Sequence, residues 1–280
     1  MGIVGTKEGD NSMPAYHTDR SSRAEDSPPT SESKSVSNGG AVSKTIEEYL
    51  PELSAAWEIA LDRLHTYYDE LQESHAFLAA INRVILEVPE FEGIQFRNVS
   101  ELRLYRSLLY LLTRAFCPEV FVETGVLNGF SSAFVLLAMQ HNSAGTLHSI
   151  DLPPVDERIR MQGTGPLPHG KAPGWAIPDG LRTRHRLSLG DARVLLPQIL
   201  ERQGSIDVFL HDSDHSYEHM MLEMALAWPC LRQGGWLLCD NVEQNRAFSD
   251  FVCGVNAISS VAASFDSPER TWKHGMARKH

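Results

Sequence analysis

The sequence predicts an α/β fold with a doubly wound, mostly parallel sheet of seven strands, an antiparallel last strand and preceding N-terminal helices. Three observations lead to this fold class. Residues 45–116 repeat apolar side chains at steps of three and four, as amphipathic helices do. Residues 120–240 alternate short β-type runs with helical patterns, which is typical of βαβ units and a parallel sheet. Two β-type stretches at the end of the chain fit a closing antiparallel hairpin.

The chain divides into three regions. Residues 1–44 are rich in Ser, Gly, Pro and charged side chains and poor in large apolar ones, so we expect a disordered tail. Residues 45–97 form a helical extension. Residues 98–280 form the main domain, which opens with a helix to Phe116 that Ser100 caps. The apolar face of the extension includes Leu50, Leu53, Trp57, Ala60, Leu61, Leu64 and Tyr68.

The main domain alternates strands and helices. The expected strands are 120–123, 146–150, 184–188, 206–210, 236–239, 258–265 and 271–278. The expected helices are 131–140, 193–203, 217–231 and 246–253. The connection over residues 152–181 holds six prolines and five glycines. Because loops this long are uncommon in a compact domain, this one is expected to be functional or disordered.

Composition excludes several partner classes. The net charge of −11 argues against nucleic acid, because phosphate binding needs a basic surface. The longest apolar runs, such as 108–112 and 134–139, are far too short to cross a bilayer, so we expect no membrane partner. The four cysteines show neither a C-x-x-C pair nor a zinc-type spacing, and we interpret them as reduced, buried side chains of a cytoplasmic protein.

A glycine-rich turn follows the first strand, in the segment Val120–Ser132. Gly125 and Gly129 allow a sharp turn and a close approach of the backbone to a ligand. The helix that follows offers free N–H groups at its start, and open α/β sheets bind ligands at this edge. An ordinary strand-to-helix turn is the alternative. The candidate ligand-binding residues here are Glu123, Thr124, Gly125, Gly129, Ser131 and Ser132.

The turn does not match the phosphate-binding patterns. A dinucleotide turn would show G-x-G-x-x-G and a P-loop would need Gly-Lys-Ser/Thr, whereas the spacing here is G-x-x-x-G. Glu123 stands two residues before the first glycine, where an acid would repel a pyrophosphate but suit a cationic amino-acid ligand.

Two further strand ends favour a nucleoside ligand. Asp151 ends the second strand, 22 residues after Gly129, where an acid can accept both ribose hydroxyls. Gly190 and Asp191 precede a helix, and Asp191 either contacts an adenine edge or caps that helix. Together these features favour an adenosine-type ligand without a phosphate bridge.

Acidic residues follow two more strands. Asp212 comes after 206–210, and Asp240 and Asn241 come after 236–239. Because parallel strands open onto one edge, these three side chains can converge as an all-oxygen site for a hard cation such as Mg²⁺. Simple helix capping is the alternative.

Three histidines surround Asp212, and each is a candidate general base. His215 lies three residues after Asp212 and is positioned to take a proton from a metal-bound hydroxyl near neutral pH. His211 precedes the acid and His219 lies one turn into the next helix, so both compete for the role.

These motifs together resemble the class I S-adenosylmethionine (SAM)-dependent methyltransferases, a Rossmann-like family, over roughly Val99–Arg278. The segment Asp212–Tyr217 resembles the D-x-D-H-S-Y segment of the small-molecule branch. The resemblance makes residues 98–280 a methyltransferase domain. Its counterparts of the cofactor residues are Glu123, Thr124, Gly125, Gly129, Ser131, Ser132, Asp151, Gly190, Asp191 and Asp212.

Within that class, the chain is similar to metal-dependent O-methyltransferases of catechols and macrolide sugars. The similarity implies that Asp212, Asp240 and Asn241 hold Mg²⁺ and that His215 is the catalytic base, where the catechol enzymes carry a lysine. It also implies in-line attack of a substrate oxygen on the sulfonium methyl group. The expected partner is a small-molecule methyl acceptor, and the N-terminal helices make a homodimer plausible.

Three other functions remain open at this stage. An NAD-dependent oxidoreductase would also use Asp151, but the G-x-x-x-G spacing with Glu123 argues against it. A non-catalytic SAM-binding protein would have no need for the acidic strand ends at Asp240 and Asn241, which serve a metal and a base in an enzyme. A metal-independent N-methyltransferase differs only in the metal and in the accepting atom.

Overall fold

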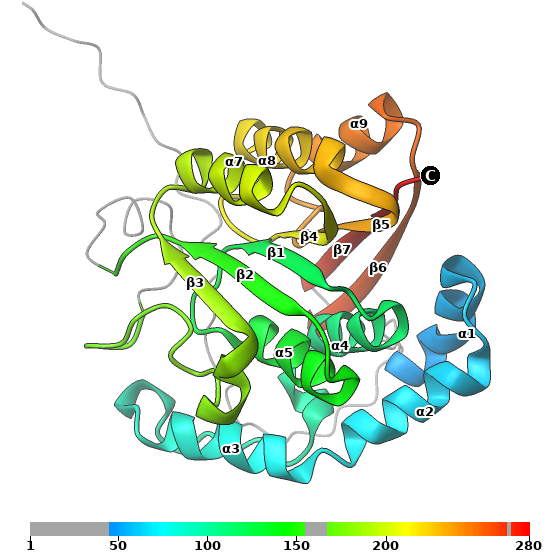
Figure 1. Cartoon of the computed structure of the whole chain (residues 1–280). Helices are drawn as coiled ribbons and strands as arrows, with labels where there is room; N and C mark the ends of the chain where they lie inside the picture. The colour runs from blue at the N-terminus through cyan, green and yellow to red at the C-terminus, as the bar shows by residue number, and fades with distance from the viewer. Residues whose placement is uncertain (1–44, 155–166, 268–269) are drawn as a thin grey trace, which may run out of the picture.

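The computed structural model describes residues 45–154, 167–267 and 270–280 (Figure 1). The disordered tail expected over 1–44 lies outside the described residues. The helices are α1 (Ile46–Trp57), α2 (Leu61–Gln72), α3 (His75–Leu86), α4 (Leu104–Phe116), α5 (Phe130–Asn142), α7 (Ala192–Gln203), α8 (Tyr217–Cys230) and α9 (Ala247–Gly254). The strands are β1 (Val120–Thr124), β2 (Thr146–Asp151), β3 (His185–Leu189), β4 (Ile206–His211), β5 (Leu231–Cys239), β6 (Ile258–Ser267) and β7 (Arg270–Arg278).

The strands form one seven-stranded sheet in the order β3-β2-β1-β4-β5-β7-β6. Strands β1 to β5 pair in parallel, and β7 pairs antiparallel with both β5 and β6. The predicted α/β fold is therefore confirmed, including the antiparallel strand. The strand order reverses between β1 and β4, and ligands of open α/β sheets bind at such a point.

Helices cover both faces of the sheet (Figure 1). Helices α4 and α5 pack on one face with α1 to α3 outside them, and α7, α8 and α9 pack on the other. Because side chains alternate along a strand, β1 contributes Phe121 to the first layer and Val122 to the second. The next two residues, Glu123 and Thr124, continue this alternation with polar side chains.

The helix expected from 98 to Phe116 is divided in two. A 3-10 turn covers Val99–Leu102, and Arg103 then takes a left-handed conformation at φ 79° before α4 begins. The cap of the 3-10 turn is Asn98, which accepts from the Glu101 N–H, so the prediction that Ser100 caps a continuous helix is wrong. An asparagine side chain reaches the N–H three residues on just as serine does, and here it stands two residues earlier.

The prediction that the cysteines are buried holds for only part of the set. Cys239 is buried at the end of β5, Cys230 is half-buried, and Cys117 and Cys253 are exposed. Cys117 ends α4 in a left-handed conformation at the surface, although its neighbours in sequence are apolar. No helix within the described ranges combines the length and the apolar character that a bilayer span requires.

Candidate functional site

The turn after β1 lies directly against the end of β4. Gly125 has φ +82°, and a Cβ at this position would lie 1.8 Å from the carbonyl oxygen of Asp212. Its N–H donates to the Ile150 carbonyl at 2.9 Å, which also ties the turn to β2. Glycine at position 125 is thus required by both the conformation and the contact. The consequence is that the glycine-rich turn and the acidic segment form one site.

The second glycine of the turn supports the long loop after β2. Gly129 has φ +88°, and a Cβ there would lie 2.8 Å from the backbone of Gly174. The Trp175 indole donates to Asn128 Oδ1 at 2.6 Å, and the Ala176 N–H donates to the Asn128 carbonyl at 2.9 Å. Residues 174–176 therefore pack on the glycine-rich turn, and Trp175 is buried in the core.

Glu123 is fully buried between β1 and α5. Its Oε1 accepts from the hydroxyls of Ser132 at 2.5 Å and Ser149 at 2.6 Å, while its Oε2 has no partner among the described residues. Burial raises the pKa of Glu123 to about 7, against the lowering effect of the two serines. Two of the predicted turn residues, Glu123 and Ser132, therefore meet; Ser131 lies half-buried at the start of α5.

The predicted ribose acid is engaged with the same turn. Asp151 Oδ2 accepts the N–H groups of Val126 and Leu127 at 2.9 and 2.6 Å. Burial raises the pKa of Asp151, opposed by these backbone donors. Asp151 is therefore not a freely solvated acid, because its carboxylate accepts two backbone N–H groups of the turn. Its position beside the turn is the one the sequence predicted.

Asp191 caps α7. Its side chain accepts from the Arg193 N–H at 2.9 Å and pairs with the Arg193 guanidinium at 2.6 Å. Gly190 precedes it and donates its N–H to the Asp151 carbonyl at 2.8 Å. The helix-capping interpretation is therefore confirmed, and the pair Gly190–Asp191 lies next to the end of β2.

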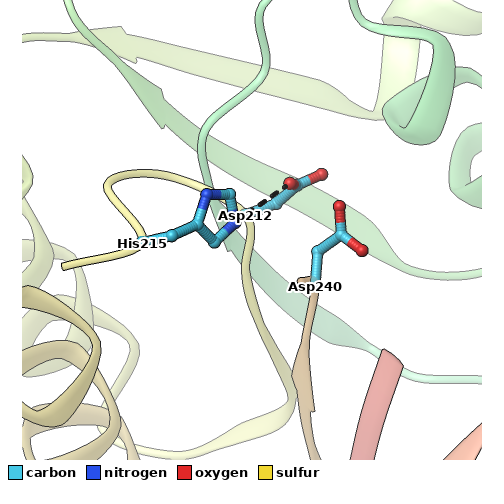
Figure 2. A group of neighbouring side chains, drawn as sticks. All are labelled: Asp212, His215 and Asp240. Atoms are coloured by element: carbon cyan, nitrogen blue, oxygen red, sulfur yellow. Dashed lines mark ion pairs between the residues drawn. The ribbon is translucent and has the colours of Figure 1, made fainter. Parts of the chain in front are cut away.

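Asp212, His215 and Asp240 converge at the carboxyl edge of the sheet (Figure 2). One ligand atom from each lies within 4.8 Å of the other two. The His215 Nε2 lies 3.9 Å from Asp212 Oδ1 and, within the described part of the chain, has no hydrogen-bond partner. Asn241, which follows Asp240 in sequence, has φ 52° and a buried Oδ1 that is likewise unpartnered by any described residue. The structure thus brings together three of the side chains that the sequence singled out, namely Asp212, His215 and Asp240.

The electrostatics of this cluster are set partly by a residue from β7. Burial would raise the pKa of Asp240, but the His274 imidazole outweighs burial and holds that pKa well below its usual range. The His274 Nδ1 lies 2.5 Å from Asp240 Oδ1. The Tyr105 ring stacks on His274, with centroids 4.2 Å apart. Burial, reinforced by the nearby His211, lowers the pKa of His215 to about 4, so its imidazole is neutral at pH 7.

The structure distinguishes the three candidate histidines. The His211 Nδ1 and the His219 Nε2 both bond the carboxylate of Glu223, at 2.6 and 2.8 Å. No hydrogen bond joins His215 to Glu223 in the described part of the chain, and the His215 ring is oriented toward Asp212 (Figure 2). Of these three histidines, His215 is the one whose ring nitrogen the structure places close to both Asp212 and Asp240.

Sequence reasoning missed three residues of this site. It assigned no role in this cluster to His274, Tyr105 or Glu223. The His219–Glu223 spacing of four on one helix was a visible signal for the last of these. The other two contacts join residues far apart in sequence, for which a single chain gives no signal.

Comparisons with known proteins agree with this geometry. Residues 122–242 match a family model described as a methyltransferase domain. It includes the glycine-rich turn, Asp212, His215, Asp240 and Asn241. No curated protein matches the sequence.

Solved methyltransferase structures are similar to this chain at low sequence identity. An O-methyltransferase from Bacillus cereus in complex with SAH is 14% identical with a TM-score of 0.50, covering 73% of this chain and 91% of that one. The O-methyltransferase TomG from Streptomyces achromogenes is 16% identical with a TM-score of 0.46, covering 72% and 89%. A methyltransferase from Geobacter sulfurreducens is 20% identical with a TM-score of 0.46, covering 78% and 97%. The first similarity supports the Rossmann-like fold of the described sheet.

Proposed function

We propose that this chain is a SAM-dependent methyltransferase that methylates a hydroxyl of a small molecule with the assistance of Mg²⁺. One observation carries the proposal. Within the stretch that matches a methyltransferase domain, the carboxylates of Asp212 and Asp240 and the His215 imidazole gather beside the glycine-rich turn, and Asn241, with a buried amide oxygen, follows Asp240 in sequence. We take the catalytic domain to be residues 98–280, because the sheet extends to Arg278 and α4 packs against it.

The cofactor-binding side is built around the turn after β1. SAM, when bound, supplies the methyl group on its sulfonium. In this proposal the turn residues from Glu123 to Ser132 face the amino-acid part of SAM, Asp151 the ribose, and Gly190–Asp191 the adenine. Two features support the first of these assignments: the Oε2 of Glu123 has no partner among the described residues, and the N-cap Gly129 gives the start of α5 no side-chain cap.

The donor set suits a magnesium ion. Asp212 and Asp240 lie close together, and Asn241 adds a buried oxygen that no described side chain or backbone group satisfies. Such oxygen ligands are those that Mg²⁺ prefers. When bound by these three residues, Mg²⁺ would act as a Lewis acid that lowers the pKa of the acceptor hydroxyl.

His215 then takes the hydroxyl proton at its Nε2. The nitrogen is neutral at pH 7 and directed at the aspartates, as a general base requires. The same position would also allow His215 to be a metal ligand, because its nitrogen is within 4.8 Å of the carboxylate oxygens. A base and a ligand differ in one measurable respect, namely whether the metal still binds without the imidazole.

The experiment is a screen of hydroxylated metabolites with SAM, with release of S-adenosylhomocysteine as the readout. We expect turnover that EDTA abolishes and Mg²⁺ restores, and a loss of at least about 10²-fold in Asp240→Ala, since a ligand and its charge are removed. His215→Ala should lose turnover but still bind Mn²⁺ as a Mg²⁺ analogue. Undiminished turnover of Asp240→Ala would contradict metal assistance, and lost Mn²⁺ binding in His215→Ala would make His215 a ligand.

A further inference from the structure

A second buried carboxylate lies behind the acidic cluster, on α8. Glu223 is fully buried and accepts four side-chain hydrogen bonds. The Thr124 hydroxyl (2.5 Å) and the His211 Nδ1 (2.6 Å) bond its Oε2, while the Ser213 hydroxyl (3.0 Å) and the His219 Nε2 (2.8 Å) bond its Oε1. Each oxygen thus receives one hydroxyl and one imidazole, and the proposed reaction uses neither oxygen.

The partners of Glu223 come from the turn after β1, from the segment around Asp212, and from α8 itself, where His219 lies. Thr124 precedes Gly125 in the turn after β1, and His211 and Ser213 stand on either side of Asp212. A backbone bond from the Asp212 N–H to the Thr124 carbonyl also joins the turn to the segment around Asp212. The carboxylate therefore fixes both ends of the segment that carries Asp212.

The contact with His211 also determines which ring nitrogen of that residue carries hydrogen. Because Glu223 accepts the hydrogen bond from Nδ1, His211 holds a proton there, and its Nε2 is turned away from the carboxylate. This Nε2 is buried and unpartnered among the described residues. The His211 ring meets the His215 ring edge to face, with centroids 5.4 Å apart and planes at 87°. The orientation of the His211 ring thus limits where the His215 ring can lie.

We propose that Glu223 is a positioning residue of the methyl-transfer site, which holds Asp212 and His215 in their working geometry through Ser213 and His211. The inference rests on the proposed function, because it concerns the same site. Glu223 touches neither reactants nor metal in this scheme. It acts through residues that do, as groups behind metal ligands commonly act.

Glu223→Gln tests this inference with little change in shape. A glutamine amide presents one acceptor oxygen and one donor NH₂, so one pair of donors loses its acceptor or His211 must move its proton to Nε2. We expect kcat to fall by about 10- to 100-fold, with the KM for SAM unchanged, and Mn²⁺ affinity to fall by about tenfold. Mn²⁺ binding is measured on the full chain without SAM or acceptor. All rates are measured well below the melting temperature of the variant.

The matched control is Glu70→Gln. Glu70, on α2, also lies beside a histidine, with His141 Nδ1 at 3.0 Å, and accepts from the Arg114 guanidinium at 2.8 Å, but it lies among the N-terminal helices. Its variant should keep the wild-type kcat and Mn²⁺ affinity. Should Glu223→Gln fail to fold, Ser213→Ala removes a single donor and should lower kcat several-fold with the KM for SAM unchanged.

The outcomes separate this inference from the proposed function. If the wild type turns over and Glu223→Gln and Ser213→Ala keep its kcat and Mn²⁺ affinity, Glu223 is only structural and the inference fails while the function stands. If the wild type methylates no acceptor, the proposed function fails, and the Mn²⁺ comparison alone decides whether Glu223 positions Asp212. Equal losses in Glu70→Gln would also overturn the inference.

Discussion

Two fully buried glutamates lie on opposite faces of the sheet at β1, and they differ in charge. Glu123 faces α5 and accepts from two serine hydroxyls, and burial raises its pKa to about 7. Glu223, on α8, accepts a hydrogen bond from the hydroxyl of Thr124 on β1. Burial acts on its pKa in the same direction, but His211 and His219 outweigh it and lower that pKa to about 2.

The difference shows that burial alone does not determine the charge of a carboxyl group. Two neutral hydroxyls leave Glu123 close to half-protonated at neutral pH, whereas two imidazoles and two hydroxyls keep Glu223 ionised. An ionised, saturated carboxylate is suited to holding its neighbours in place. A carboxyl group with an unpaired oxygen is suited to meeting a ligand, which agrees with the roles proposed for the two residues.

The largest expected effect comes from replacing each glutamate by glutamine. Glu223→Gln leaves buried donors without their charged acceptor, and we expect it to lower the free energy of unfolding by roughly 3–5 kcal/mol. Glu123→Gln at pH 8 replaces a buried charge by a neutral amide and should cost little or stabilise the fold. Urea unfolding at pH 8 measures both. Equal destabilisation by the two substitutions would contradict the difference in charge between the two glutamates.

The next effect is a pH dependence of stability that belongs to Glu123. Its pKa rises from 4.5 in the unfolded chain to about 7 in the fold, so the folded state holds its proton longer. The stabilisation from this protonated group is complete below pH 4.5 and is lost as pH rises to about 7. The free energy of unfolding of the wild type should fall by about 3 kcal/mol relative to Glu123→Gln over this interval. Parallel curves for the two proteins would contradict the raised pKa.

The smallest expected effect is the loss of one hydrogen-bond donor to each carboxyl group. Thr124→Val removes a hydrogen bond to an ionised group and should cost about 1.5–3 kcal/mol of unfolding free energy. Ser132→Ala, measured at pH 6 where Glu123 is mostly protonated, should cost about 0.5–1.5 kcal/mol. The test is the order of the two values in urea unfolding, and the reverse order would count against the charge difference.

The sequence was sufficient to predict the sheet and the side chains at its carboxyl edge. Strand ends are visible as apolar runs that stop at an acid, and parallel pairing then brings Asp212 and Asp240 to one edge. The contact between Thr124 and Glu223 was not predictable, because the two residues lie 99 positions apart and nothing local links them. Similarly, the break at Arg103 interrupts an apolar pattern that continues on both sides of it.

The central claim is that SAM donates a methyl group at this site with the help of a metal held by Asp212, Asp240 and Asn241. The most direct measurement is S-adenosylhomocysteine release by the full chain from SAM and a panel of hydroxylated acceptors, in EDTA and in Mg²⁺, for wild type and Asp240→Ala. The account predicts that the wild type releases S-adenosylhomocysteine in Mg²⁺ but not in EDTA, and that Asp240→Ala releases almost none in either. Release that is equal in EDTA, or undiminished in Asp240→Ala, would contradict it.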